Sequence, residues 1–128
     1  MWYGVRMNSV EKGRLAEVKV ASEMVQQGME VFIPAFGNAK CDLIALNSEG
    51  VALRVEVKYC DAYSNRGKSW EVGLRQTRNN SSGTKNKKFN GKNSDKLAVY
   101  LAAVDKVMLF DSETLHGRST LAIRFDEV

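Results

Sequence analysis

Residues 41–59 read Cys-Asp-Leu-Ile-Ala-Leu-Asn-Ser-Glu-Gly-Val-Ala-Leu-Arg-Val-Glu-Val-Lys-Tyr, and the prediction of the fold starts from these residues. In residues 51–59 apolar side chains occupy every odd position, and Ala, Arg, Glu and Lys occupy the even ones. Such alternation is typical of a strand with one buried face. Residues 41–46 form a preceding strand, and the turn at residues 47–50 joins the two as a hairpin.

Glu56 and Lys58 are two residues apart on the predicted strand, so their side chains point to the same face. A hydrolytic metal site uses this arrangement, because the carboxylate holds Mg²⁺ and the neighbouring ammonium orients water or neutralises the phosphate. The same residues also fit the solvated face of an antiparallel strand. An identical triplet, Glu17-Val18-Lys19, lies on a predicted helix, so the triplet alone does not decide between the two interpretations.

Asp42 opens the strand that the hairpin places beside Glu56. The four residues after it, 43–46, are all apolar, as in a strand covered on both faces. An acid at the start of such a strand is costly unless it is paired or binds a metal. The alternative is an aspartate that sits in solvent where the strand begins.

Asn8 and Glu11 have the spacing of a capping box, which predicts a helix over residues 9–27 that ends at Gly28. Glu17 falls near the middle of the apolar arc of this helix. That arc is formed by Val10, Val20, Ala21, Met24 and Val25. A carboxylate there needs a partner, which is either Arg14 in a structural ion pair or a metal site across the helix–sheet interface.

The charge is concentrated in one segment, because residues 66–96 contain nine Lys/Arg and two acids, whereas the rest of the chain has ten bases and thirteen acids. This asymmetry indicates a polyanionic partner. Residues 78–96 are rich in Asn, Ser, Gly and Lys, with Phe89 as the only large apolar side chain, which predicts a mobile loop that packs no core. The candidate DNA contacts in this basic region, about residues 75–96, are Arg75, Arg78, Lys85, Lys87, Lys88 and Lys92.

Five more strands are predicted, at residues 29–36, 70–74, 97–104, 106–110 and 120–125, although residues 97–104 also fit a helix. With no internal repeat or domain boundary, residues 1–128 are expected to form a single α/β domain with a mixed sheet packed against the N-terminal helix.

Other classes of function receive little support from the sequence. No apolar run approaches the length of a membrane helix. The two cysteines are too few for a disulfide scaffold, which places the protein in the reducing cytoplasm. A metal-independent ribonuclease would require the single histidine, His116, close to a tyrosine, and a surface loop position is the simpler interpretation of that residue.

Glu17, Asp42 and the Glu56-Val57-Lys58 triplet together resemble the PD-(D/E)XK nuclease superfamily. Within it, the sequence is most similar to archaeal-type Holliday junction resolvases and to the small homing endonucleases of group I introns. Residues 13–58 carry the resemblance best, and residues 70–110, with Asp-Lys-Leu-Ala-Val-Tyr at 95–100, are similar to the intron-encoded branch.

The resemblance implies a restriction-endonuclease-like fold and Mg²⁺-dependent hydrolysis of DNA that leaves 5′-phosphate and 3′-hydroxyl ends, with Mn²⁺ as a substitute. Asp42 and Glu56 would bind the metal with the Val57 carbonyl, Lys58 would assist the water, and Glu17 would be a further acid of the metal site. The DNA is duplex or branched, and a homodimer or higher homo-oligomer is expected because one active site cuts one strand.

Two features depart from the superfamily pattern. Cys41 stands where the motif has proline, and the Asn- and Lys-rich segment is a poor candidate for the core helix expected after the strand at residues 51–59. A non-catalytic nucleic-acid-binding module on the same fold is therefore the alternative function.

Overall fold

The structure is a computed structural model that describes residues 6–64, 67–80 and 83–128, without the side chains of residues 76–86. Arg66, at one end of the basic segment, lies outside the described residues, as do the side chains of Arg78 and Lys85. No helix in these ranges is long and apolar enough to cross a membrane.

Helix α1 (Ser9–Gln26) begins at the predicted capping box, in which the Glu11 N–H donates to Asn8 Oδ1 over 2.9 Å and the Asn8 N–H donates to Glu11 Oε1 over 3.1 Å. It ends one residue before the predicted bound. Gly28 follows with a left-handed φ of 86°, which lets the chain turn away.

The helix buries a narrower face than the sequence predicted. Its buried residues are Ala16, Val20 and Met24, which are spaced four apart and so form one stripe. Val10 and Val25, placed on the core face by the sequence analysis, are 60% and 59% exposed. That placement is wrong, because the helix meets the sheet along the stripe of Ala16, Val20 and Met24 with Ala21 beside it, and Val10 and Val25 lie outside this contact.

A five-stranded mixed sheet has the order β1-β2-β3-β7-β8. Strand β3 is its centre, antiparallel to β2 and parallel to β7. The predicted hairpin turn is confirmed by the bond from the Gly50 N–H to the Asn47 carbonyl. The strands of this sheet are β1 (Glu30–Phe32), β2 (Leu43–Leu46), β3 (Ala52–Cys60), β7 (Lys96–Leu101) and β8 (Lys106–Asp111).

Two of these strands refine the predictions. Residues 97–104 fitted either a strand or a helix, and β7 is a strand whose residues 97–101 are all buried. This continuous burial on both faces explains the unbroken apolar sequence, which hid the strand periodicity. Strand β1 covers only Glu30–Phe32, because the chain leaves the sheet near Pro34, which has no N–H to donate.

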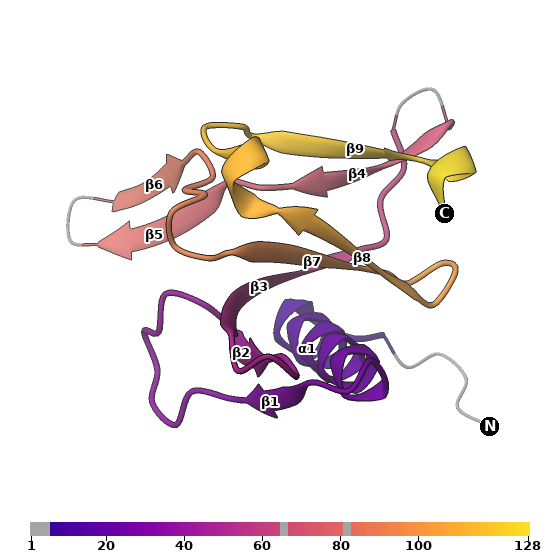
Figure 1. Ribbon diagram of the computed structural model, residues 1–128. Helices are drawn as coiled ribbons and strands as arrows, with labels where there is room; N and C mark the ends of the chain where they lie inside the picture. The colour runs from indigo at the N-terminus through magenta and orange to yellow at the C-terminus, as the bar shows by residue number, and fades with distance from the viewer. Residues whose placement is uncertain (1–5, 65–66, 81–82) are drawn as a thin grey trace.

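The two faces of this sheet carry separate apolar clusters. Helix α1 packs on one face against Leu43, Ala45, Val55 and Ala98. A two-stranded sheet of β4 (Ser69–Gly73) and β9 (Thr120–Arg124) lies on the other side (Figure 1). No α-helix follows β3 in the described ranges, so this small sheet and the 3₁₀ helix η1 (Ser112–Leu115) occupy the second layer.

The basic segment is not the unstructured loop that the sequence predicted. Strands β5 (Gln76–Asn80) and β6 (Gly83–Lys87) pair as an antiparallel hairpin. Phe89 is 1% exposed and belongs to the apolar cluster beneath β4 and β9. The prediction that this segment packs no core is therefore wrong: its one large apolar residue anchors the chain between the hairpin and β7.

Gly91 lies where the chain between β6 and β7 passes close to η1, and its substitution tests this contact. A Cβ atom at Gly91 would lie 2.4 Å from the Ser112 carbonyl oxygen, so Gly91→Ala must displace backbone. We expect it to lower the free energy of unfolding by about 1–3 kcal/mol in urea denaturation. Gly73→Ala is the matched control, because nothing lies within 4 Å of a Cβ added there. Equal stabilities of the two variants would contradict the close packing.

Candidate active site

Strand β3 presents Glu56 and Lys58 on the face that points away from α1. Their partners on β7 are Leu97 and Val99, which belong to the cluster on the β4–β9 side. The shared face is therefore as the sequence predicted. Glu56 is only 8% exposed and Lys58 is half-buried. The interpretation of this face as solvated is wrong at Glu56.

Asp42 lies beside this pair, one residue before β2 begins. Its N–H donates to the Val55 carbonyl over 2.9 Å, and its Oδ2 accepts the Val57 N–H over 2.7 Å. The hairpin thus holds the Asp42 carboxylate against the backbone of the residue between Glu56 and Lys58. A short hydrogen bond of this kind to a carboxylate is charge-assisted and fixes the carboxylate in place.

The Val57 carbonyl faces the same edge of β3 as Asp42. In a strand the N–H and C=O of one residue point to the same neighbour, and the Val57 N–H points to Asp42. The β2 ladder reaches only to Val55, which pairs with Leu43. The Val57 carbonyl oxygen therefore lies at the open end of β2.

Glu17 reaches this end of β2 from α1. Burial raises the pKa of Glu17, the negative charge of Asp42 raises it further, and Arg14 partly opposes the shift. Among the described residues no ion pair joins Glu17 to Arg14. The structure thus places Glu17 near Asp42 and gives no support to the predicted structural ion pair.

A cleft of about 230 Å³ is shared by Glu17 and Asp42. Its other wall is the segment between β1 and β2, which includes Ile33, Pro34 and Phe36. The two carboxylates thus line one small cleft beside the start of β2.

The donors at this site are oxygen atoms, the ligands that Mg²⁺ and Mn²⁺ prefer. Asp42, Glu56, Glu17 and the Val57 carbonyl fit such a cation by their chemistry. In the part of the chain that the structure describes, no three acidic, cysteine or histidine side chains converge on a complete cation site. The structure therefore brings the candidate ligands to one end of the sheet without closing them around a single point.

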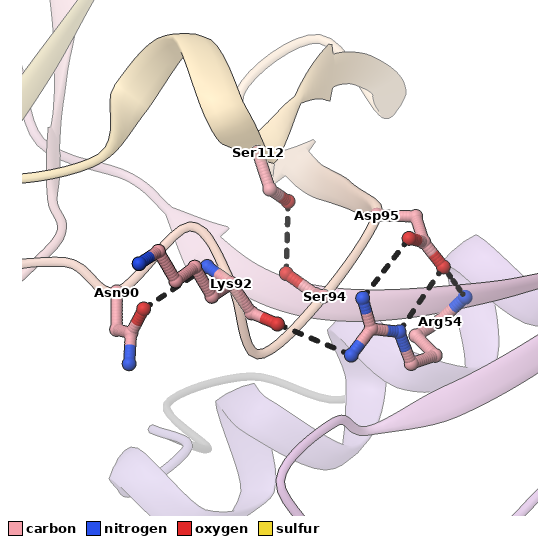
Figure 2. A network of polar contacts seen from close by, with 6 residues as sticks. All are labelled: Arg54, Asn90, Lys92, Ser94, Asp95 and Ser112. Carbon is pink, nitrogen blue, oxygen red and sulfur yellow. Dashed lines mark hydrogen bonds and ion pairs between the residues drawn. The ribbon is translucent and has the colours of Figure 1, made fainter.

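A polar network that the sequence analysis missed holds the loop before β7 (Figure 2). Arg54 donates through its backbone N–H and its guanidinium to both carboxylate oxygens of Asp95, at 2.8–3.2 Å, and its Nη1 donates to the Lys92 carbonyl. These bonds hold the pKa of Asp95 below its usual range. The buried Ser94 and Ser112 hydroxyls share a bond of 2.8 Å. The sequence held one signal for this network, because Asp95, like Asp42, is an acid directly before an apolar strand.

The candidate DNA contacts lie around the β5–β6 hairpin and the loop that follows it. Arg75, Lys87, Lys88 and Lys92 are exposed. The hairpin and the β1–β2 segment both lie on the left side of the view in Figure 1. Leu43, the first residue of β2, and Lys96, the first residue of β7, both pair with Val55, so the two segments enter the sheet on either side of β3 next to Glu56.

His116 has a structural partner. Its Nδ1 accepts the Gly91 N–H over 3.0 Å, and it lines a cleft of about 540 Å³ with Arg54 and Lys92. No tyrosine is among the described residues that line this cleft. The ribonuclease interpretation, which required His116 beside a tyrosine, therefore gains no support.

Comparisons with known proteins agree with this architecture. Residues 7–127 match a family model described as PD-(D/E)XK endonuclease. Among solved structures, that of a bacterial homing endonuclease, I-Ssp6803I, is similar with a TM-score of 0.78 and 22% sequence identity, over 91% of this chain and 78% of that chain. At this identity the likeness shows a shared fold. No match was found among curated proteins.

Glu17→Gln separates a structural from a site role for Glu17. Because the folded-state pKa is raised above the ordinary value of 4.5, the folded protein binds the extra proton more strongly than the unfolded chain. Wild-type stability should therefore fall as pH rises from 4.5 through the raised pKa. The variant lacks this loss of stability. At neutral pH without divalent cations, its unfolding midpoint should therefore lie at a urea concentration at least as high as that of the wild type.

Glu23→Gln, on the same helix, is the control and should leave the pH dependence of stability as in the wild type. A strongly lowered melting temperature of Glu17→Gln at neutral pH, together with an unchanged response to Mg²⁺, would instead establish a structural role.

Proposed function

Because the chain belongs to the PD-(D/E)XK endonuclease family, we propose that it hydrolyses DNA phosphodiester bonds at the Asp42, Glu56 and Lys58 site with the help of Mg²⁺. The observation that carries the proposal is the bond from the Val57 N–H to Asp42 Oδ2, which sets the first acid beside the strand that bears the other two residues. Mn²⁺, another oxygen-preferring cation, is expected to substitute.

Asp42, Glu56 and the Val57 carbonyl are the residues that would hold the cation, and Glu17 would be a further acid of the same site. A divalent cation there polarises the phosphate and lowers the pKa of a water molecule, so no histidine base is required. Asp42 is the fixed point, because both its N–H and its carboxylate are bonded to β3. The nearly buried Glu56 is shielded from bulk water, which strengthens its interaction with a cation.

Lys58 shares the face of Glu56 and makes no ion pair among the described residues. Its ammonium is therefore available to a phosphate. We assign it the role of holding the attacking water against the phosphorus and neutralising the charge that develops on the phosphate. Water adds to phosphorus, the bond to the 3′ oxygen breaks, and that oxygen takes up a proton, which leaves 5′-phosphate and 3′-hydroxyl ends.

The substrate class follows from the family and from the basic hairpin. The similarity to a homing endonuclease supports a duplex target, and a branched DNA of the Holliday junction type is the second candidate. Residues 1–128 act as one nuclease domain, and a homodimer or higher homo-oligomer would cut both strands. Both cysteines are free, which suits a reducing cytoplasm.

Glu56→Gln and Lys58→Ala should each lower cleavage of plasmid DNA in Mg²⁺ by at least about 100-fold, because each removes a charge from the reacting centre. DNA affinity and the unfolding midpoint should change little. Glu71→Gln and Lys106→Ala, exposed positions away from the site, are the matched controls. Wild-type rates in either site variant would overturn the assignment. A wild-type chain that binds DNA but cuts none in Mg²⁺ or Mn²⁺ would be a binding module.

Replacing Lys87 and Lys88 with alanine tests the basic segment. If both neutralise phosphates, the slope of log affinity against log salt should fall by about 2. Affinity should fall equally for all sequences, because phosphate contacts carry little sequence information. Lys85 is a third candidate in the same hairpin. Binding measured at several salt concentrations is the assay, with Lys106→Ala as control. An unchanged slope would mean that these lysines serve solubility alone.

A further inference from the structure

The end of β1 and the segment that joins it to β2 expose apolar side chains at the edge of the candidate active site. Phe36 is 87% exposed, Ile33 is 60% exposed, and Phe32 is 52% exposed. Single exposed apolar residues are common on proteins, but three within five residues of one segment form a patch. Its position beside a functional cleft indicates a binding role.

This patch and the candidate metal ligands share one cleft. Phe36, Ile33 and Pro34 line the same space of about 230 Å³ as Glu17 and Asp42. DNA that presents a phosphate to Asp42 would therefore lie close to this segment. A second protein chain seated on Phe36 would instead cover the cleft and exclude the substrate.

The charge of the side chains in this segment determines which part of the DNA the segment can contact. Residues 31–39 carry no charged side chain. They cannot neutralise phosphates, and the neighbouring carboxylates of Glu17 and Asp42 repel them. The segment has one exposed lysine, Lys40, which follows these residues, whereas Lys87, Lys88 and Lys92 lie on the hairpin side of the site. An uncharged surface with an outward aromatic ring fits the apolar faces of bases. An aromatic side chain can stack on these faces whatever the DNA sequence is.

We propose that Phe36 contacts the base stack next to the cleaved phosphate, inserting as an apolar wedge while Asp42 and Glu56 face the backbone. This inference rests on the proposed DNA cleavage and adds to it a device that distorts the duplex at the cut site. Partial unstacking by such a wedge kinks DNA, which exposes the backbone at that step.

Phe36→Trp, made in a Trp2→Phe background, turns the ring into a fluorescent reporter. The remaining Trp70 is 5% exposed and so is insulated from ligand. Titration with a short random-sequence duplex in EDTA, and with heparin as a polyanion without bases, separates stacking from charge. We expect the duplex to quench the emission of the new indole and heparin to leave it unchanged.

Phe36→Ala gives the matching energetic test. Loss of one base contact should weaken duplex binding by about tenfold, within the range for a stacked aromatic residue. The salt slope should not change, because phenylalanine neutralises no phosphate. Val18→Ala removes a 64% exposed apolar side chain from α1 and should leave affinity unchanged.

Several results would overturn the wedge. Saturating duplex that leaves the indole emission unmoved, or heparin that quenches it equally, would exclude base contact. Dissociation of an oligomer by Phe36→Ala in sedimentation would make the patch a protein interface. If wild-type protein cuts DNA but the indole does not respond, only the wedge fails. If wild-type protein neither binds nor cuts duplex DNA, the proposed function fails and the wedge fails with it.

Discussion

The bond from the Val57 N–H to Asp42 Oδ2, 2.7 Å long, is the interaction on which the candidate site depends. It extends the contact between β2 and β3 beyond their ladder, which ends at Leu43 and Val55. A hydrogen bond to a charged group contributes about 1.5–3 kcal/mol, enough to hold the end of a strand in one position. Because β3 is also fixed by its parallel pairing with β7, Glu56 and Lys58 have little freedom relative to Asp42.

This arrangement places the carboxylates of Glu17 and Asp42 where their negative charges repel one another. Asp42 raises the pKa of Glu17 in addition to the effect of burial, which means that ionising both acids costs free energy in the folded protein. The two apolar clusters on either side of the sheet supply the stability that tolerates this cost. A cation that bound the folded arrangement and not the unfolded chain would both relieve this repulsion and stabilise the fold.

The parts of the molecule that the sequence predicted are those set by local patterns. The capping box of α1 and the strand β3 each depend on residues a few positions apart. The capping box is found where expected, and β3 begins and ends one residue later than predicted, at Ala52–Cys60. Long-range partners were not predictable in this way. Arg54 and Asp95 are 41 residues apart, and the burial of Phe89 depends on β4 and β9, which close the cluster around it.

The loop before β7 and the segment between β1 and β2 lie on two sides of the site and are held with different firmness. This difference suits their proposed partners, which are phosphates for the loop and bases for the segment. The loop before β7 is tied to β3 by Arg54 and Asp95 and to the turn after η1 by the bond between Gly91 and His116. Cations near such a loop are presented at fixed positions, which suits the regular spacing of phosphates. Residues 33–41 make no hydrogen bond among the described residues. That segment can therefore shift without breaking backbone contacts, as a side chain that enters a base stack must do when the duplex bends around it.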